Sequence, residues 1–364
     1  MNRLVLLGNG FDLAHGLPTR YEDFMLQYLK DVFKKKHDAS GLIYVKREYI
    51  YRFDSKSEHA WGKGIDDATN INELLKHLYS NNKIVTYNIK SNFLSGLLNN
   101  LDKNNWVDIE SEYYRLLKIC YRSPNSHKIA QLNKDFETLK SILESYLKKE
   151  VEETYYFKPS KEFLNIFLTK KKDIPETSAF SVPNAYPEKT LFLNFNYTTL
   201  LEDYLIEPEV IHHLRDHEVN YIHGELESAE NPIIFGFGDE MDKSYQEIEE
   251  LNNNAYFEHI KSFQYLKTSN YQDLIRFLDG SVEGYEIYII GHSCGLSDRT
   301  LLNHVFEHDH CKSIKIFYHN GIKGYTNTVY EISRHFNDKA SMRTKIVPFE
   351  KSIPTPQVQL EKSI

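Results

Sequence analysis

Cysteine is scarce in this 364-residue sequence, and the pattern of the few cysteines excludes one class of site. Cys120, Cys294 and Cys311 are widely separated, and no two of them form a C-x-x-C pair. A sparse, odd set of this kind excludes a thiolate zinc module and supports a reducing compartment.

Long apolar runs are also missing. The N-terminal run Leu4–Leu7 holds four residues before Gly8, which is too short for a signal peptide, and no stretch approaches the length of a membrane span. We therefore expect a cytoplasmic protein with no membrane partner.

Positive charge is in deficit, because 44 Lys and Arg face 52 Asp and Glu, for a formal net charge of −8. A protein that coats nucleic acid needs basic faces to displace phosphate counterions, so nucleic acid is not an expected partner. The apolar share of 41% and the charged share of 26% are those of a soluble globular protein.

What the sequence does contain is a series of short apolar runs bounded by turn residues, which indicate buried strands of a parallel sheet. The clearest are 3–7, 190–194, 233–235, 285–290 and 313–318, and weaker ones are 219–222 and 345–348. Helical periods separate several of them. This alternation predicts an α/β fold with a doubly wound, mostly parallel, Rossmann-like sheet.

The segment after the first strand is helical in pattern, with helices predicted over 21–35, 71–79, 106–120 and about 126–155. We therefore predict a sheet core from 1–20 and 186–350, and a large helical insertion over 21–185. The polar C-terminal tail, 351–364, either is loose or packs on a partner.

The first predicted strand runs into a glycine loop, Gly8-Asn9-Gly10-Phe11-Asp12. Glycines permit positive φ and let backbone N–H groups approach an anion, and a following helix would add its dipole. Leu13 stands where the dinucleotide fingerprint has its third glycine, and the next glycine is Gly16. A tight structural turn is the alternative interpretation.

Pro18 and Thr19 fit a helix start, with Thr19 as the cap and Glu22 closing a capping box.

Two polar residues follow later predicted strands, where open α/β sheets bind ligands. Asn196 comes after 190–194, and it or Thr198 could instead cap the next helix. His223 follows 219–222 and precedes Gly224, and a histidine there can act as a general base near neutral pH.

The loop after 285–290 contains Gly291, His292, Ser293 and Asp298, and Ser297 or Asp298 can cap a helix whose N–H groups face the site. Ser293 lies between Gly291 and Gly295 at nucleophile-elbow spacing, a minor alternative. Residues 232–240 form a further strand and glycine turn that ends at Asp239 and Glu240.

Within the insertion, Asn105 and Asp108 are placed to satisfy the free N–H groups of a helix start, and Trp106, Ile109 and Tyr113 form an apolar stripe typical of core packing. The carboxylates Asp108, Glu110 and Glu112 have no assigned role; Asp108 and Glu112 share a face at i, i+4 and could hold a divalent ion.

The stretch 4–24, with Gly-Asn-Gly-Phe-Asp, Gly-Leu-Pro-Thr and Tyr-Glu-Asp-Phe, resembles the opening of the AbiH family of phage abortive infection proteins. That family is similar to sirtuin-like nucleotide-binding domains, which carry an Asn and a His-Gly at later strand ends. Asn196 and His223-Gly224 match those positions in order.

The resemblance implies that the Asn orients a ribose hydroxyl or water while the His accepts a proton, as the glycosidic bond of NAD breaks. The nucleotide would be held by Gly8–Asp12, Gly16, Pro18, Thr19, Gly291, His292, Ser293 and Asp298. Thr198 replaces an acidic residue of the sirtuin pattern, which puts ligand geometry in doubt, and the missing zinc ribbon argues against protein deacylation.

These features predict an abortive-infection effector that hydrolyses NAD, with no required cofactor and no metal site. A non-catalytic nucleotide sensor and a metal-dependent nuclease using Asp12, Asp108, Glu110 and Asp239 are the alternatives. The expected partners are a nucleotide and a phage-derived trigger or neighbouring defence protein, and the aromatic stripes of the insertion favour a homo-oligomer.

Overall fold

The computed structural model describes residues 1–47, 55–80, 85–104, 108–122, 126–155, 158–170, 186–238, 240 and 242–358. The chain divides into two compact units. The first comprises Met1–Leu17, Leu147–Asn252 and His259–Ile364, and the second comprises Pro18–Tyr146 and Asn253–Glu258. Within the predicted insertion, residues 21–146 lie in the second unit and residues 147–170 lie in the first.

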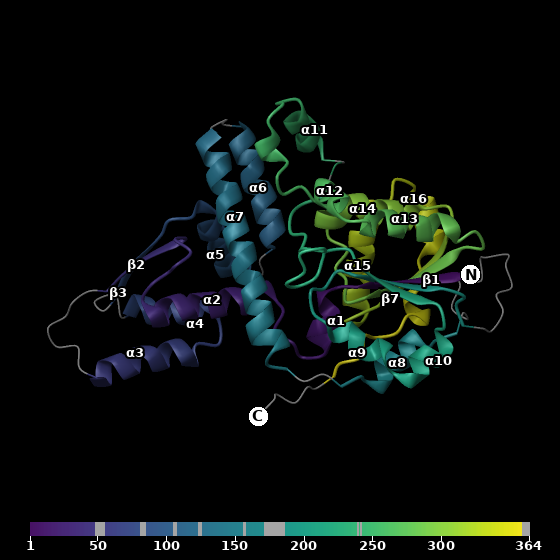
Figure 1. Cartoon of the computed structure of the whole chain (residues 1–364), viewed down its shortest axis with the longest axis horizontal. Helices are drawn as coiled ribbons and strands as arrows, with labels where there is room; N and C mark the ends of the chain where they lie inside the picture. The colour runs from purple at the N-terminus through teal and green to yellow at the C-terminus, as the bar shows by residue number, and fades with distance from the viewer. Residues whose placement is uncertain are drawn as a thin grey trace. The chain divides into compact units, whose positions relative to one another are not determined.

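The first unit is built on a five-stranded, wholly parallel sheet (Figure 1), and the strand order is β5-β4-β1-β6-β7. Its strands are β1 (Asn2–Leu7), β4 (Thr190–Asn194), β5 (His217–Tyr221), β6 (Tyr285–Ile290) and β7 (Cys311–Phe317). With helices on both sides, this is the doubly wound, Rossmann-like α/β fold that the sequence predicts.

The other elements of the first unit are helices. They are α1 (Asn9–Ala14), the π-helical η1 (Leu147–Glu152), α8 (Lys161–Phe167), α9 (Leu200–Leu205), α10 (Pro208–His213), α11 (Lys243–Glu249), α12 (Lys261–Gln264), η3 (Tyr265–Lys267), α13 (Asn270–Gly280), η4 (Leu296–Asp298), α14 (Arg299–Glu307), α15 (Gly321–His335), α16 (Lys339–Lys345) and η5 (Phe349–Lys351).

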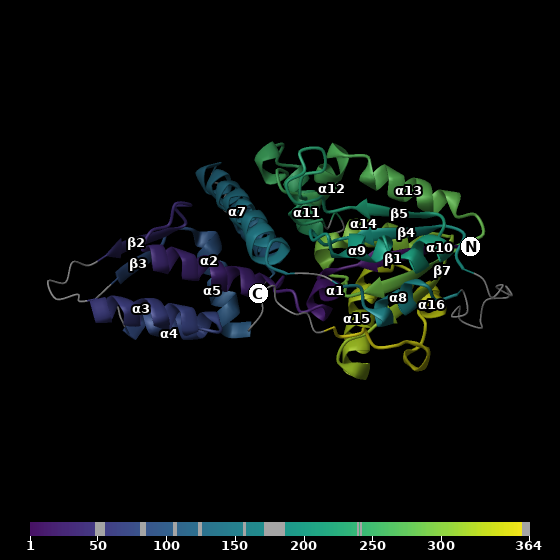
Figure 2. The same cartoon turned by 60° about the horizontal axis from the view of Figure 1, so that its bottom comes forward.

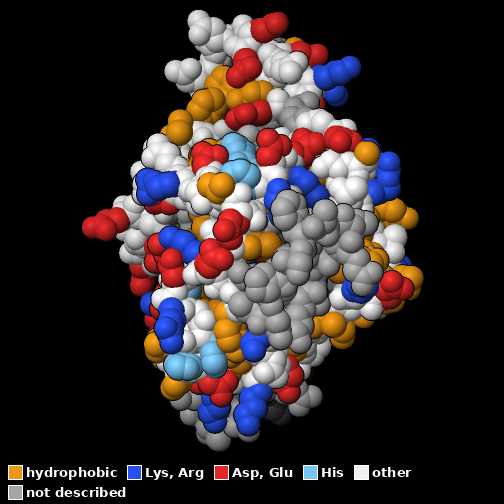
Figure 3. All heavy atoms as spheres, turned by 90° about the vertical axis from the view of Figure 1, so that its right-hand side faces the viewer, with side chains coloured by type: hydrophobic (Ala, Val, Ile, Leu, Met, Phe, Trp, Pro, Cys, Tyr) orange, Lys and Arg blue, Asp and Glu red, His pale blue; other side chains and the backbone are white. Residues whose placement is uncertain are grey.

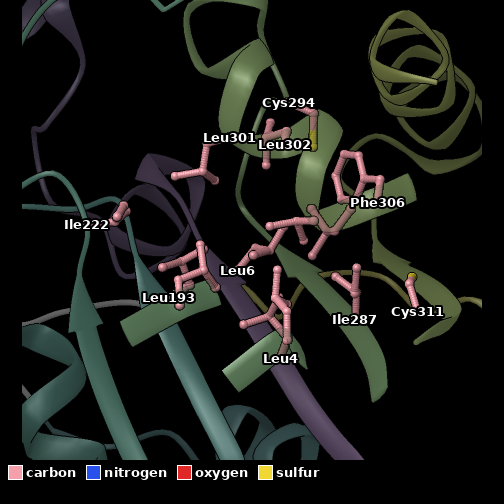
Figure 4. Packing of buried hydrophobic residues seen from close by; sticks show 14 of the residues in the cluster. Leu4, Leu6, Leu193, Ile222, Ile287, Cys294, Leu301, Leu302, Phe306 and Cys311 are labelled. Atoms are coloured by element: carbon pink, nitrogen blue, oxygen red, sulfur yellow. The ribbon is translucent and has the colours of Figure 1, made fainter. Parts of the chain in front are cut away.

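One face of the sheet carries the main apolar core, beneath α13 and α14 (Figures 2 and 4). Alternate strand residues point to this face because side chains of a strand alternate between its two sides. The cluster includes Leu4, Leu6, Leu193, Ile287, Leu301, Leu302 and Phe306. Each such buried side chain contributes about 1.5–3 kcal/mol of transfer free energy, so the core fixes the strand order firmly.

The opposite face contains a buried ion pair. Arg3, fully buried, contacts Glu286 with 2.7 Å between Nη2 and Oε1, and its guanidinium lies 4.3 Å from the ring centre of Tyr288. Arg3 also donates to the carbonyl of Phe167 at 3.0 Å, which ties α8 to this face. Register places Arg3 opposite Glu286, so the pair is set by strand alignment.

The second unit consists mainly of helices, which are α2 (Tyr21–Lys35), α3 (Ser55–Asp67), α4 (Ile71–Ser80), α5 (Asn92–Asn104), α6 (Ile109–Arg122), α7 (Ser126–Tyr146) and the short η2 (Asn254–Tyr256). It also contains an antiparallel pair that the sequence analysis does not predict, β2 (Ile43–Arg47) with β3 (Val85–Ile89). Tyr44 and Tyr87 on these strands are exposed, so the pair lacks the continuous apolar run by which buried strands are recognised.

Residues 233–235, predicted as a strand, form a loop instead. The N–H of Ile234 donates to the carbonyl of His223 at 2.6 Å, and Phe237 makes an isolated bridge with Ile260. All three residues of the run are buried. A short apolar run shows burial but does not distinguish a strand from a buried loop, which explains the wrong prediction.

Residues 351–358 of the C-terminal tail are ordered against the first unit and are not loose. Ser352 and Thr355 are buried, and Thr355 N–H donates to the carbonyl of Tyr318 just beyond β7 at 2.8 Å. Val358 N–H donates to the carbonyl of Ala14 at the end of α1. The tail therefore packs on the first unit, because its backbone finds hydrogen-bond partners there.

Candidate functional site

The carboxyl ends of the parallel strands share one edge of the sheet, and the strand order decides which loops meet there. From β1 the chain builds β4 and β5 on one side, and it then returns to the other side of β1 as β6 and β7. Such a reversal is a topological switch point, where α/β sheets bind ligands. The loops after β1 and β6 therefore lie side by side.

Gly8 and Gly10 are required where these two loops touch. A Cβ on Gly8 would lie 2.5 Å from the Cα of His292, and one on Gly10 would lie 2.6 Å from the Cα of Gly291. Their N–H groups donate to the carbonyls of Ile290 and Gly291. Neither glycine has positive φ. The expectation of a positive-φ loop with N–H groups turned to an anion is therefore wrong, because the protein's own second loop occupies that approach.

Asn196, at the end of β4, binds the first loop. Its Nδ2 donates to the carbonyl of Gly8 and to Oδ1 of Asp12, each at 3.1 Å. Thr198 Oγ1 donates to both oxygens of Asp12, at 3.1 and 3.0 Å. Neither side chain caps α9, whose preceding residue is Thr199. Asp12, Asn196 and Thr198 form what we call the Asp12 cluster.

The carboxyl of Asp12 is held by neutral donors. Burial raises the pKa of Asp12 to about 8, opposed by the hydrogen bond from Thr198 and reinforced by the charge of Glu152. At neutral pH this side chain is therefore mostly a protonated acid that can itself donate a hydrogen bond. Asp12 of the first loop therefore supplies a carboxyl beside Asn196. The sequence itself has Thr198 at the position where the sirtuin pattern has its acidic residue.

His223 follows β5 and meets the end of the β6 loop. Its Nε2 lies 3.0 Å from Oδ1 of Asp298, and the Nζ of Lys261 lies 2.8 Å from the same oxygen. Burial lowers the pKa of His223, and the Lys261 charge lowers it further against the opposing effect of Asp298. Burial alone would raise the pKa of Asp298, but Lys261 and His223 outweigh it and hold that pKa well below its usual range.

His292 completes this second group, which we call the Asp298 cluster: His223, Lys261, His292 and Asp298. The Nε2 of His292 lies 3.8 Å from Oδ2 of Asp298, and burial lowers the pKa of His292 to about 4. Phe195, which directly precedes Asn196 of the Asp12 cluster, packs against this second cluster, since its ring centre lies 4.9 Å from that of His223 and 4.1 Å from that of His292. The structure therefore brings together loops that follow four different strands.

Other predicted ligand-binding residues are distributed differently. Phe11 is a core residue, packed against Phe163 with ring centres 5.1 Å apart. Asn9, Gly16 and Ser293 are exposed, and Gly16 has φ of +78°. Pro18 and Thr19 belong to the second unit.

The predicted cap of α2 is one residue off. Arg20, not Thr19, precedes that helix, and Arg20 N–H donates to Asp23 rather than to Glu22. Threonine is a preferred capping residue and arginine is not, so the capping pattern in the sequence pointed to Thr19.

Lys261 is the member of the site that sequence reasoning missed. Its side chain is fully buried, although lysine is almost never buried unless paired. No pattern around it in the sequence marks this, because its partner Asp298 lies 37 positions away along the chain.

The carboxylates of the insertion have local partners. Asp108 Oδ1 accepts from Ser111 N–H at 3.0 Å near the start of α6, as expected for a helix start, and Glu112 accepts from Arg115 at 2.7 Å. Within the described parts of the chain, no group of three or more His, Cys, Asp or Glu side chains is arranged to hold a metal ion. Asn105, Trp106 and Asp239 lie outside the described residues.

Ile109 and Tyr113, the two described members of the apolar stripe that includes Trp106, are fully buried as core residues. On the face of the molecule shown in Figure 3, acidic and basic side chains are interspersed. Across the described residues, no helix combines the length and apolar character needed to cross a membrane.

Comparison with known proteins gives one match. A family model described as "Bacteriophage abortive infection AbiH" matches residues 4–320, which include most of β1 and all of β4, β5, β6 and β7. No curated protein and no solved structure matches the chain. Since the family model covers most of the sequence, the chain belongs to the AbiH family of bacteriophage abortive infection proteins.

Proposed function

We propose that the first unit binds a nucleotide at the carboxyl edge of its sheet and hydrolyses the nicotinamide N-glycosidic bond of NAD, so that abortive infection proceeds by NAD depletion. The observation that carries the proposal is that the Asp12 and Asp298 clusters lie at the same edge of the sheet, where Asn196 binds Gly8 and Asp12 while the neighbouring Phe195 packs against His223 and His292. They combine an amide, a protonated acid, a neutral imidazole and an ionised carboxylate at a switch point.

The reaction converts NAD and water into ADP-ribose, nicotinamide and a proton. The carbon–nitrogen bond to nicotinamide breaks with its electron pair leaving on the nicotinamide nitrogen, and the oxygen of water bonds to the ribose carbon. Asn196 would orient the water or a ribose hydroxyl, and His223 would accept the released proton. A lowered pKa keeps His223 neutral near pH 7, which a proton acceptor requires.

The polar groups of the site are largely shielded from solvent in this structure. The side chains of His223 and Asp298 are each 8% exposed. Burial strengthens every electrostatic interaction among these groups, which favours chemistry once a ligand is inside. It also means that the loops after β5 and β6 must open to admit NAD. Such opening gives a physical place for a phage-derived trigger to act.

The experiment is to incubate purified full-length chain with NAD, with and without lysate of phage-infected cells, and to measure nicotinamide release. Asn196→Ala and His223→Ala should each lower release by about 10²-fold or more, the usual range for a removed acid–base group. Asn327→Ala and His319→Ala are matched controls, since both residues are exposed in the same unit, and they should release nicotinamide at the wild-type rate.

Full activity in both Asn196→Ala and His223→Ala would refute the assignment. A chain that binds NAD or ADP-ribose in a thermal-shift assay without turnover under any trigger would instead be the non-catalytic sensor.

A further inference from the structure

Lys261 begins α12, and its side chain is 0% exposed. An ammonium group loses several kcal/mol of hydration when it is buried, so it persists only where a partner and good geometry compensate. The partner is Asp298, whose Oδ1 lies 2.8 Å from the Lys261 Nζ. Apolar side chains of similar volume often give equal stability, so the buried pair is weak evidence for a purely stabilising role of Lys261.

The backbone around Lys261 is built to hold it in place. Its N–H donates to the carbonyl of Phe237 at 3.0 Å, and Gly238 N–H donates to the carbonyl of Ser297 at 2.9 Å. A Cβ on Gly238 would lie 3.2 Å from the Cβ of Lys261, which is tighter than ordinary packing. The loop at 237–238 therefore bridges Lys261 to the residue next to Asp298.

The side chain of Asp298 binds residues of the site and does not cap the helix that follows it. It precedes α14, where an aspartate usually accepts a hydrogen bond from the first helical turn, but its side chain makes no such bond. Its Oδ1 is shared between Lys261 and His223 instead, at 2.8 and 3.0 Å. An ionised carboxylate only accepts, so His223 donates through Nε2 to Asp298, and a backbone hydrogen bond with Phe195 also holds the ring.

We propose that Lys261 is a positioning residue of the site, which fixes the carboxylate of Asp298 and through it the orientation and donor nitrogen of the His223 imidazole. This inference deepens the proposed function and rests on it for its effect on rate. Among the described residues, the titratable groups that face His223 are Asp298, Lys261, His292 and Tyr265. Of these, Lys261 is the fixed cation.

The test compares Lys261→Met and Lys261→Gln, which remove the charge, with Lys261→Arg, which keeps it. Lys267→Met is the control, because Lys267 is exposed a few residues away. Two properties are measured on the full chain: the NMR titration of the His223 ring, which needs no turnover, and the pH profile of nicotinamide release.

In both neutral variants His223 should titrate at a higher pH than in the wild type, because the charge of Lys261 lowers the pKa of His223. The acid limb of the pH profile should move the same way, and release at neutral pH should fall by about tenfold to 10²-fold through misplacement of the ring. Lys261→Arg should restore most of both properties, and Lys267→Met should change neither.

A His223 titration that is the same in a folded neutral variant as in the wild type would overturn the inference. So would the case in which both neutral variants fail to fold while Lys261→Arg folds, because Lys261 would then be structural only. If the titration shifts but no protein releases nicotinamide, Lys261 controls His223 and the proposed NAD hydrolysis is wrong. The two failures are therefore distinguishable.

Discussion

Replacing Asp12 with asparagine should make the first unit less sensitive to pH. The carboxyl is almost fully buried and accepts from Asn196 and Thr198, which are neutral donors. Burial raises its pKa from 3.8 to about 8. An amide of the same shape can keep the two accepted hydrogen bonds on its oxygen while removing the ionisable group, so the substitution isolates the effect of the charge.

The size of the effect follows from proton linkage. Above pH 3.8 the unfolded chain releases the proton of Asp12, whereas the folded chain keeps it until about pH 8. The folded state therefore binds more protons in this window, and stability falls as pH rises. Each pH unit corresponds to about 1.4 kcal/mol, so the wild type should lose about 4 kcal/mol through this group between pH 4 and pH 7. Asp12→Asn has no such term.

The assay is urea denaturation followed by far-UV circular dichroism at several pH values between 4 and 8. The free energy of unfolding of Asp12→Asn minus that of the wild type should increase steadily with pH. Asp216→Asn, at an exposed position of the same unit, should show no such increase. A difference that stays constant across this range would show that Asp12 ionises normally in the folded protein, and the argument for a protonated acid beside Asn196 would fail.

Two further substitutions test the packing around the site. Gly291→Ala should destabilise the first unit by several kcal/mol, because Gly291 has φ of +68° and a Cβ there would overlap the first loop. Gly295→Ala should be tolerated, because a Cβ there would make only ordinary van der Waals contacts. Equal melting temperatures for the two variants would refute this. Arg3→Met should lower the free energy of unfolding by about 3–5 kcal/mol, because it leaves Glu286 buried without its cation. The double variant Arg3→Met with Glu286→Met should recover most of this loss in urea unfolding. A double variant as unstable as the single one would show that the unpaired charge is not the cause.

Much of the fold follows from short-range signals in the sequence. β4 and β6 occupy the predicted residues, and β1, β5 and β7 begin one or two residues earlier than predicted. They could be predicted because a strand buried on both faces needs a continuous apolar run. The pair β2 and β3 was missed, since its half-exposed strands have no such run, and 233–235 was wrongly predicted because a buried loop can have one.

The candidate site divides in the same way. Asn196, His223 and Asp298 could be named because each follows a predicted parallel strand, and such strand ends share an edge. Their partners could not be named. Whether Asn196 caps a helix or binds Asp12 depends on two loops 184 positions apart, and capping patterns in the sequence fit both outcomes.

By itself, the sequence determined the parallel sheet, the mainly helical character of the segment that follows β1, and the strand ends from which a site is built, because apolar period and glycine position are local properties. Tertiary structure alone decided that the glycines of the first loop make room for the β6 loop, that Asp12 is held as a neutral acid and that Lys261 is buried against Asp298. These depend on burial and on distances between residues far apart in the chain, and electrostatic energies in a protein are set by those two quantities.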